Sequence, residues 1–264
     1  MKLASDSPRL LGITVAFVMA ASGATALPIG WSAVGDAGTF TPNGVVSSLP
    51  EISTYYYVST ANGIDGVGAL AGAGGDGIPT NGSTLISPVF SAAVGSSLGF
   101  KFNYVTSDDA IFADYAWAQV INVDDPSGSL LLFTARSTLG GDTVPGFSMP
   151  ALAEGLTLDP PATPIIPGGP LWDQLGEDSG ECWFTGCGYT GWINGTYEFT
   201  QAGNFRLQFG VTNWNDSFFH SGMAIAGTTI DGVPIAVIPL PAAGWLLLGG
   251  LGALAVVRRR RSAA

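Results

Sequence analysis

One stretch of the chain decides the fold class: residues 205–212 read Phe-Arg-Leu-Gln-Phe-Gly-Val-Thr, with large apolar side chains at every second position. Successive side chains of a β-strand point to opposite faces, so this alternation is typical of a strand that buries one face. Residues 98–104 read Leu-Gly-Phe-Lys-Phe-Asn-Tyr and repeat the pattern. These two segments predict half-buried strands of a sheet.

Strand-like segments extend outward from these two, and most are bounded by Gly, Pro, Asn or Asp. They are residues 54–59, 85–90, 115–123, 129–136, 196–200 and 223–235. Eight or nine short strands without intervening helices favour a sandwich over a βαβ fold. We therefore predict an all-β protein with a single antiparallel β-sandwich over residues 27–236.

Two stretches interrupt the pattern of short strands. Residues 61–82 are rich in Gly, and residues 142–180 contain seven prolines. Both are predicted to be long surface loops. The Pro-rich stretch resembles a domain linker, but only about three strands follow it, which are too few to bury an independent core.

The charge of the chain is unevenly distributed. Of the nine basic residues, only Lys101, Arg136 and Arg206 lie outside the terminal segments, against nineteen acidic residues from 27 onward, which gives a formal charge of about −16. Such a field repels phosphate backbones and attracts cations. This composition excludes nucleic-acid binding.

The first 26 residues have the order of a secretory signal peptide. Lys2 and Arg9 precede an apolar run over residues 10–21, and Ala-Thr-Ala at 24–26 forms a small-residue cleavage site. The apolar run is shorter than the roughly 20 residues that a membrane-spanning helix needs. We expect cleavage after Ala26 and export of the mature chain.

The C-terminal segment 237–264 combines three features in order. A short proline motif consists of Ile238, Pro239, Leu240, Pro241 and Ala242; an uncharged stretch follows at 242–257; and Arg258, Arg259, Arg260 and Arg261 come next. The uncharged stretch would make a helix of about 24 Å, which barely crosses a hydrocarbon core. The arginines are expected to stay cytoplasmic, so the domain lies on the far side of the membrane, in agreement with the signal peptide.

This tail resembles the PEP-CTERM sorting signals, most closely the variant with the motif Val-Pro-Leu-Pro-Ala, in which Ile238 replaces Val. The resemblance implies an exosortase as processing partner, a Gram-negative host that makes extracellular polysaccharide, and a final location at the cell surface or in the extracellular matrix. An ordinary tail anchor is the alternative, because it needs only length and flanking charge.

The central domain also resembles secreted jelly-roll domains that are common in PEP-CTERM proteins and similar in fold to carbohydrate-binding modules. The similarity is spread over residues 30–35, 107–117 and 223–233. It implies a fold rather than an activity.

Cys182 and Cys187 are the two cysteines of the chain. Because an exported protein meets an oxidising compartment, a disulfide is the expected state. It would stabilise the protein by about 2 kcal/mol on the chain-entropy model and fix a local turn near Trp183 and Trp192. A zinc site would need four ligands, commonly from Cys and His, and His220 is the single histidine of the chain. We therefore do not expect a zinc site at these cysteines.

Asp108, Asp109 and Asp114 lie between two predicted strands and are expected to share one loop. Carboxylate oxygens of this kind can bind Ca²⁺, which needs six to eight oxygen ligands. Three residues at the end of another predicted strand can supply further oxygen ligands, namely Asn213, Asn215 and Asp216. A solvated acidic turn is the alternative.

No catalytic constellation stands out in the sequence. There is no Gly-x-Ser-x-Gly elbow, no particular carboxylate pair is distinguished, and His220 reads as the end of a loop that enters a strand. Loop aromatics such as Trp183, Trp214 and Phe218 can stack on sugar rings or simply pack. We expect a non-catalytic surface or matrix protein associated with extracellular polysaccharide or biofilm; the alternatives are a secreted polysaccharide-active hydrolase and a passive coat protein without a ligand.

Overall fold

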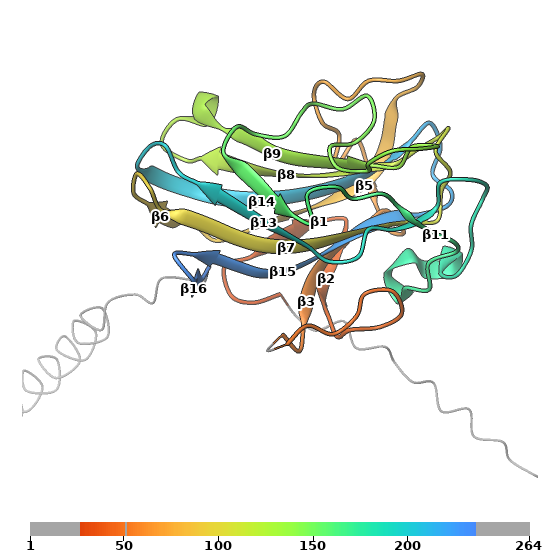
Figure 1. Ribbon diagram of the computed structural model, residues 1–264, viewed down its shortest axis with the longest axis horizontal. Helices are drawn as coiled ribbons and strands as arrows, with labels where there is room; N and C mark the ends of the chain where they lie inside the picture. Colours follow the sequence, from red (N-terminus) through yellow and green to blue (C-terminus); the bar gives the residue numbers. More distant parts are fainter. Residues whose placement is uncertain (1–26, 51, 236–264) are drawn as a thin grey trace, which may run out of the picture.

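The computed structural model describes residues 27–50 and 52–235, which form two antiparallel β-sheets packed face to face (Figure 1). Helical structure in this part consists of two short 3-10 elements, η1 (Pro126–Gly128) and η2 (Asp173–Asp178). The prediction of an all-β sandwich is confirmed. Jelly-roll topology stays a prediction.

Sheet I, the seven-stranded sheet, has β14 at its centre, between β5 and β8, and is antiparallel throughout. Its main path runs β1 (Ser32–Val34), β5 (Pro79–Ile86), β14 (Gly203–Trp214), β8 (Tyr115–Asn122) and β9 (Leu130–Arg136). Two short strands pair beside this path: β4 (Ile64–Asp65) with β5, and β6 (Phe90–Ala92) with β14.

Sheet II, the nine-stranded sheet, faces sheet I. Its main path runs β10 (Leu156–Asp159), β13 (Ile193–Glu198), β7 (Ser97–Thr106), β15 (Ser221–Ile230), β3 (Tyr55–Ser59) and β2 (Asp36–Phe40). Beside this path lie β11 (Ile166–Pro167), β12 (Gly188–Tyr189) and β16 (Val233–Pro234). β13 and β15, which follow the Pro-rich stretch in sequence, both pair with β7, which precedes it. The segments on the two sides of this stretch therefore belong to one sheet.

The main hydrophobic core fills the space between the sheets. Phe133 of β9 stacks on Phe102 of β7 with ring centroids 4.0 Å apart, and Phe100 lies between Phe133 and Phe209, at 5.8 and 6.4 Å. The alternating apolar residues of β7 and β14 supply much of this core. Each such side chain contributes about 1.5–3 kcal/mol when it is buried, so the alternation visible in the sequence accounts for much of the burial.

A second core covers the outer face of sheet II and corrects one prediction. Trp172 is fully buried, and its indole Nε1 donates to the Tyr55 hydroxyl over 2.7 Å. Leu175 packs beside it, against Val105 and Ala224 of the sheet. Residues 142–180 are therefore not simply a surface loop, because a tryptophan among the prolines anchors them and they contribute β10, β11 and η2.

Three other predicted segments differ in detail. Residues 85–90 are split between β5 and β6, since Pro88 lacks an amide donor and breaks the ladder. Residues 223–235 are likewise divided, because Asp231 and Gly232 take positive φ and reverse the chain before β16. Residues 61–82 hold β4 and the first part of β5, where a Cβ on Gly82 would lie 2.1 Å from the Val211 carbonyl oxygen.

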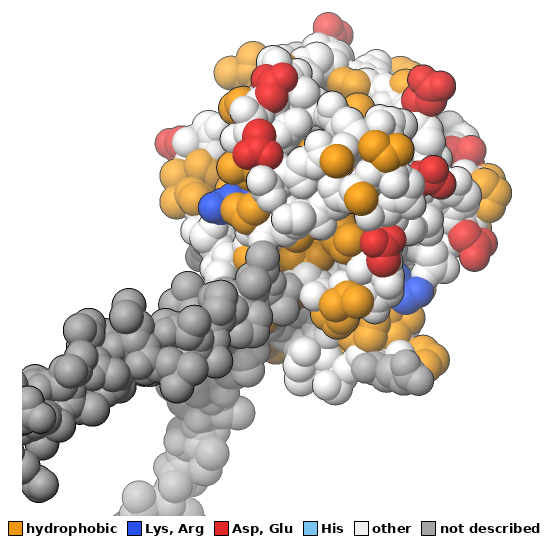
Figure 2. Space-filling view, turned by 90° about the vertical axis from the view of Figure 1, so that its left-hand side faces the viewer, with side chains coloured by type: hydrophobic (Ala, Val, Ile, Leu, Met, Phe, Trp, Pro, Cys, Tyr) orange, Lys and Arg blue, Asp and Glu red, His pale blue; other side chains and the backbone are white. Residues whose placement is uncertain are grey.

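The two ends of the sandwich have different elements. At one end, on the left in Figure 1, β15 turns into β16, and Ile235 closes the described chain with a hydrogen bond from its amide to the Thr228 carbonyl. Figure 2 views this end, where acidic side chains outnumber basic ones. The other end holds β11, η2 and the loops described below.

The predicted signal peptide (1–26) and the whole predicted sorting tail (237–264), including the motif at 238–242 and the apolar stretch at 242–257, lie outside the described residues. Within residues 27–50 and 52–235, no helix has the length and hydropathy needed to cross a membrane.

Candidate functional site at one end of the sandwich

At the end opposite Ile235, the inward positions of the strands change from apolar to polar. In β7, steps of two residues from Phe102 lead to Thr106 and then to Asp108, just past the strand. In β14, one such step leads from Val211 to Asn213. Because alternate residues share a face, these polar side chains continue the row that forms the core.

The facing strands add two more inward polar residues. Asp114 precedes β8 and shares the parity of Ala116, and Ser221 begins β15 with the parity of Met223. We call these five inward residues the polar layer: Thr106, Asp108, Asp114, Asn213 and Ser221. All five are buried, with at most 2% of each residue exposed. Other inward polar residues, such as Asn81 of β5, lie beside the polar layer.

Hydrogen bonds connect the polar layer across both sheets. Ser221 pairs with Thr106 in the ladder, and their hydroxyls lie 2.7 Å apart. Asp114 Oδ1 accepts the Trp214 amide over 2.8 Å, which places this carboxylate beside Asn213. Tyr104 of sheet II donates its hydroxyl to the Asp114 carbonyl oxygen at 2.8 Å, so the two sheets are joined here by polar contacts.

Three oxygen atoms of the polar layer have no hydrogen-bond partner among the described residues. They are Asp108 Oδ2, Asp114 Oδ2 and Asn213 Oδ1. In each side chain the other polar atom is anchored: Asp108 Oδ1 accepts the Asp109 amide at 2.8 Å, and Asn213 Nδ2 donates to Asn81 Oδ1 at 3.0 Å. The free oxygens are therefore held in fixed orientations.

Burial dominates the electrostatics of the two carboxyl groups. It raises the pKa of Asp108 to about 8, against a backbone hydrogen bond from Asp109 that lowers it, and repulsion from Asp216 adds to the rise. Burial also raises the pKa of Asp114 well above its ordinary value, with Asp108 as the next cause. Removing carboxylates from water disfavours their charged form unless a cation accompanies them.

The nearby basic side chain, Arg136, forms no ion pair with Asp108 or Asp114 within 4.0 Å, although its charge interacts with that of Asp114. Arg136 donates Nε to the Ala113 carbonyl at 2.7 Å and Nη1 to the Gly74 carbonyl at 2.6 Å, and its guanidinium lies 4.4 Å from the Trp214 ring centroid. In the part of the chain that the structure describes, the one acidic–basic contact within 4.0 Å is His220 with Asp178.

The side chain of Asp109 forms hydrogen bonds within its own loop. Its Oδ1 accepts the amides of Ile111 and Phe112 at 2.7 and 2.8 Å, which closes the loop it belongs to. No group of three His, Cys, Asp or Glu side chains within residues 27–50 and 52–235 is arranged to hold a metal. Of the three carboxyl groups that the sequence predicts as calcium ligands, Asp109 thus uses Oδ1 within its own loop, and calcium binding at these residues stays a prediction.

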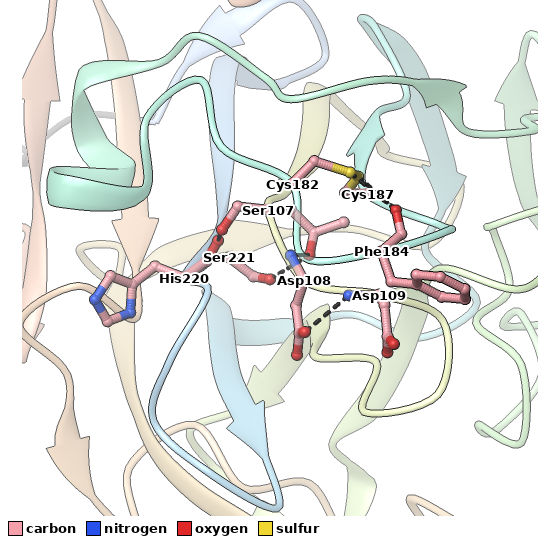
Figure 3. Close-up of a disulfide and its surroundings, with 9 residues drawn as sticks. Ser107, Asp108, Asp109, Cys182, Phe184, Cys187, His220 and Ser221 are labelled. Atoms are coloured by element: carbon pink, nitrogen blue, oxygen red, sulfur yellow. Dashed lines mark hydrogen bonds between the residues drawn. A yellow bond between two sulfur atoms is a disulfide. The ribbon is translucent and has the colours of Figure 1, made fainter.

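The predicted disulfide between Cys182 and Cys187 is confirmed, with Cα atoms 5.7 Å apart. Its loop packs on the acidic loop: the Trp183 amide donates to the Ser107 carbonyl at 3.0 Å, and the Ala110 amide donates to the Thr185 carbonyl at 2.9 Å. Figure 3 shows this loop above Ser107, Asp108 and Asp109. The crosslink therefore holds the aromatic residues of its loop against the polar end.

His220 directly precedes β15, as the sequence indicated. Its Nδ1 lies 3.3 Å from Thr60 Oγ1, and its Nε2 lies 3.7 Å from Asp178 Oδ2. Thr60 is fully buried, and its hydroxyl accepts the Ser221 amide at 3.0 Å. The hydroxyl beside the imidazole is thus engaged in the fold, and Figure 3 shows the ring directed away from Asp108.

Exposed aromatic rings gather at the same end. Five Phe, Trp or Tyr side chains of the described residues are exposed, and all five lie on loops around the polar layer. We call them the aromatic rim: Phe112, Phe147, Trp183, Phe184 and Phe218. The Trp183 ring packs against Phe219 with centroids 4.9 Å apart.

A cleft of about 230 Å³ opens within the rim. Phe112 and Phe147 line it, together with Arg136, Trp214 and Asn215. Such a cleft combines apolar faces with a few polar groups, as small-ligand sites do. Of the aromatics named from the sequence, Trp183 and Phe218 belong to the rim, whereas Trp214 is buried in its floor.

Comparison with known proteins gives distant likeness only. No family model matches the chain, and no curated protein matches it. Two cleaved adhesin domains of Lys-gingipain from Porphyromonas gingivalis W83 are similar in structure. The K1 domain has a TM-score of 0.34 at 14% identity, covering 77% of this chain and 94% of that domain. The K3 domain has a TM-score of 0.33 at 11% identity, covering 76% and 92%. We draw no functional conclusion from likeness at this level.

Proposed function

We propose that this chain is an exported, non-catalytic protein of the cell surface or extracellular matrix, and that its aromatic rim binds extracellular polysaccharide. The observation that carries the proposal is the location of all five exposed aromatic rings of the described residues at one end of the sandwich. Exposed apolar groups gathered in one place mark binding surfaces, and aromatic rings supply flat apolar faces for such contacts.

The direction of the chain supports this assignment. β15 begins at Ser221 in the polar layer and runs ten residues to Ile230, a length of about 30 Å. The described chain closes at Ile235, beside that far end of β15. A domain held by its C-terminal tail at a membrane would therefore present the aromatic rim outward, toward matrix polysaccharide.

The sorting part of the proposal rests on the sequence of the two termini. The motif Ile238, Pro239, Leu240, Pro241 and Ala242, followed by an apolar stretch and four arginines, supports recognition by an exosortase after export. Membrane association through residues 242–257 would then precede release or attachment at the surface of a Gram-negative cell.

A polysaccharide hydrolase is the competing function. Catalysis by a Ser–His pair would need a hydroxyl free to attack, and the hydroxyl that His220 contacts belongs to buried Thr60, which accepts a backbone amide. General bases are recognised first by such geometry. This contact favours a structural role for His220.

The test of ligand binding is affinity electrophoresis of the purified protein through gels containing the producing strain's own extracellular polysaccharide. Retardation is expected for the wild type and is expected to fall at least about fivefold in a Trp183→Ala, Phe218→Ala variant, because both lost rings are exposed and can contact the ligand. The control is Val94→Ala, which removes an equally exposed apolar side chain near the opposite end.

The outcomes separate the three functions. Retention that depends on the rim supports binding, whereas release of reducing ends from the same polysaccharide would establish a hydrolase. No retention of the wild type would leave a passive coat protein, and retention that the Val94→Ala control loses equally would contradict a role for the rim.

The sorting proposal has its own test. Pro239→Ala with Pro241→Ala removes the residues that keep the motif out of the apolar helix. The variant should accumulate uncleaved in the membrane fraction of a host that has the exosortase, followed by antibodies against the domain and a C-terminal tag. If the wild type also keeps its tag in the membrane, the segment is an ordinary anchor.

A further inference from the structure

The polar layer has a charge imbalance that the fold does not resolve by itself. Asp108 and Asp114 are carboxyl residues with at most 2% exposure, and no described Lys or Arg nitrogen lies within ion-pair distance of them. Burying charges without a partner costs several kcal/mol each. A sequence that places two carboxyl groups here needs either protons or a cation between the sheets.

Asn213 is an independent indication of a ligand. Its amide is uncharged, it is fully buried, and its parity in β14 places it on the inward face. It directly precedes Trp214, whose backbone amide donates to Asp114 Oδ1. Its nitrogen is satisfied by Asn81, yet its oxygen has no partner among the described residues. Buried acceptors without partners are rare in native proteins, so this oxygen calls for a donor or an ion.

The free atoms are all oxygens, and the layer carries no thiol or imidazole. His220 directs its Nδ1 to Thr60 and its Nε2 toward Asp178. In Asp114, Oδ1 already accepts a hydrogen bond from the Trp214 amide, which leaves Oδ2 free. Carboxylate and amide oxygens are the ligands of hard cations, and Ca²⁺ tolerates the irregular geometry of a site made from loops and strand ends better than Mg²⁺.

We propose that Asp108, Asp114 and Asn213 form an internal Ca²⁺ site that joins the two sheets at the polar end. The site keeps Asp108 and Asp114 from the loop that the sequence predicts and leaves out Asp109. Of the three further residues named from the sequence, it takes Asn213 of β14. Three side-chain oxygens come from the protein, and the remaining positions of the ion are filled by water or nearby hydroxyls such as that of Ser221. The ion balances the two carboxylates, and the proposal stands independently of polysaccharide binding.

The test compares the melting temperature of the purified protein in 1 mM CaCl₂ and in EGTA, together with Ca²⁺ affinity by titration calorimetry. Because a ligand that binds only the native state raises its stability by mass action, the wild type should melt higher with calcium. MgCl₂ at the same concentration should give a smaller shift.

Two substitutions each remove the charge of one proposed ligand and are expected to leave the protein folded. Asp108→Asn and Asp114→Asn should weaken Ca²⁺ binding by at least about tenfold, since the number of ligand charges sets affinity. Both variants should melt no lower than the wild type in EGTA, because a neutral amide replaces a buried acid. Loss of the calcium response with retained stability in EGTA separates loss of a ligand from a failure to fold.

The matched control is Asp109→Asn, which removes the same charge from the neighbouring residue and keeps an oxygen for the Ile111 and Phe112 amides. It should leave calcium affinity within about twofold of the wild type. Asn213→Asp adds a third carboxylate and should tighten binding several-fold while lowering the melting temperature in EGTA. The proposal is overturned if calcium does not stabilise the wild type, or if the Asp108, Asp109 and Asp114 variants respond alike.

Discussion

The apolar middle of the sandwich and its polar end are built on the same strands but hold the sheets together by different means. In the middle, Phe102 and Phe133 stack between the sheets. A few residues further along β7 and β14, the inward row continues as Thr106 and Asn213, which hydrogen-bond to neighbouring groups or leave oxygens free. The strand pattern therefore fixes which side chains face inward, while the residue type decides whether a position contributes apolar packing or polar atoms between the sheets.

The largest effect is expected in the middle. Phe133→Ala removes a fully buried ring that stacks on Phe102. It should lower the free energy of unfolding by about 3–5 kcal/mol, because large-to-small core changes lose burial and leave a cavity. Urea denaturation measures the loss. The same loss with calcium and with EGTA would show that the core acts independently of the polar end.

The next effect distinguishes the two regions by pH. With EGTA present, Asp108 has a pKa raised to about 8 by burial, whereas an unfolded aspartate titrates near 3.8. The folded protein therefore holds more protons than the unfolded chain between about pH 4 and 8, so stability is greatest below this window and falls as pH rises through it. Melting temperatures measured from pH 5 to 8 in EGTA should decline.

The control for this trend is Asp108→Asn, which cannot titrate at that position and should show a shallower decline. The direction is opposite to that of a salt-bridged aspartate, which loses stability as pH falls. A wild-type melting temperature that rises steadily from pH 5 to 8 in EGTA would contradict the buried, uncompensated carboxyl group.

Most of the apolar middle could be predicted from the sequence, because period-2 alternation is a local signal. β7 and β14 lie where Leu98 to Tyr104 and Phe205 to Val211 indicated. The anchoring of residues 142–180 by Trp172 could not, since its contacts with Tyr55 depend on residues more than a hundred positions away. Local proline content gave the wrong expectation there.

The polar end could be predicted only in part. The sequence placed Asp108 and Asp114 in one loop, but it could not show that Asp109 turns back to its own amides. The sequence also named Asn213, together with Asn215 and Asp216, and one further step of the alternation in β14 places Asn213 on the inward face. The rim residues Phe112, Phe147 and Phe184 carry no local signal of exposure, because an aromatic residue in a loop is equally able to pack inward.

A smaller effect is expected for the crosslink. Replacing Cys182 and Cys187 by Ser opens a short loop and should lower stability by about 2 kcal/mol on the chain-entropy model. The loop contacts Ser107 and Ala110 through backbone hydrogen bonds and carries rings of the aromatic rim. Polysaccharide retention should therefore decrease clearly, although the free energy of unfolding falls only by this small amount. Intact mass with and without reductant verifies the bond, and urea denaturation measures the change. A loss comparable to that of Phe133→Ala would mean that the crosslinked loop contributes as much to stability as the apolar middle, which would contradict the order of effects expected here.

The smallest effect on stability is expected at the aromatic rim. Phe147 is 64% exposed and lines the cleft beside Phe112. Phe147→Ser should change the free energy of unfolding by less than about 0.5 kcal/mol, because exposed substitutions seldom disturb the core. Retardation in polysaccharide gels should nevertheless decrease if the ligand extends from Trp183 into the cleft, since Phe147 supplies one of its apolar walls.

The matched comparison is Val94→Ala, which is similarly exposed at the far end and should change neither quantity. Full retention by the Phe147 variant would confine the binding surface to the disulfide loop and Phe218, and a marked loss of stability would show that Phe147 belongs to the packing of the sandwich and not to its binding face.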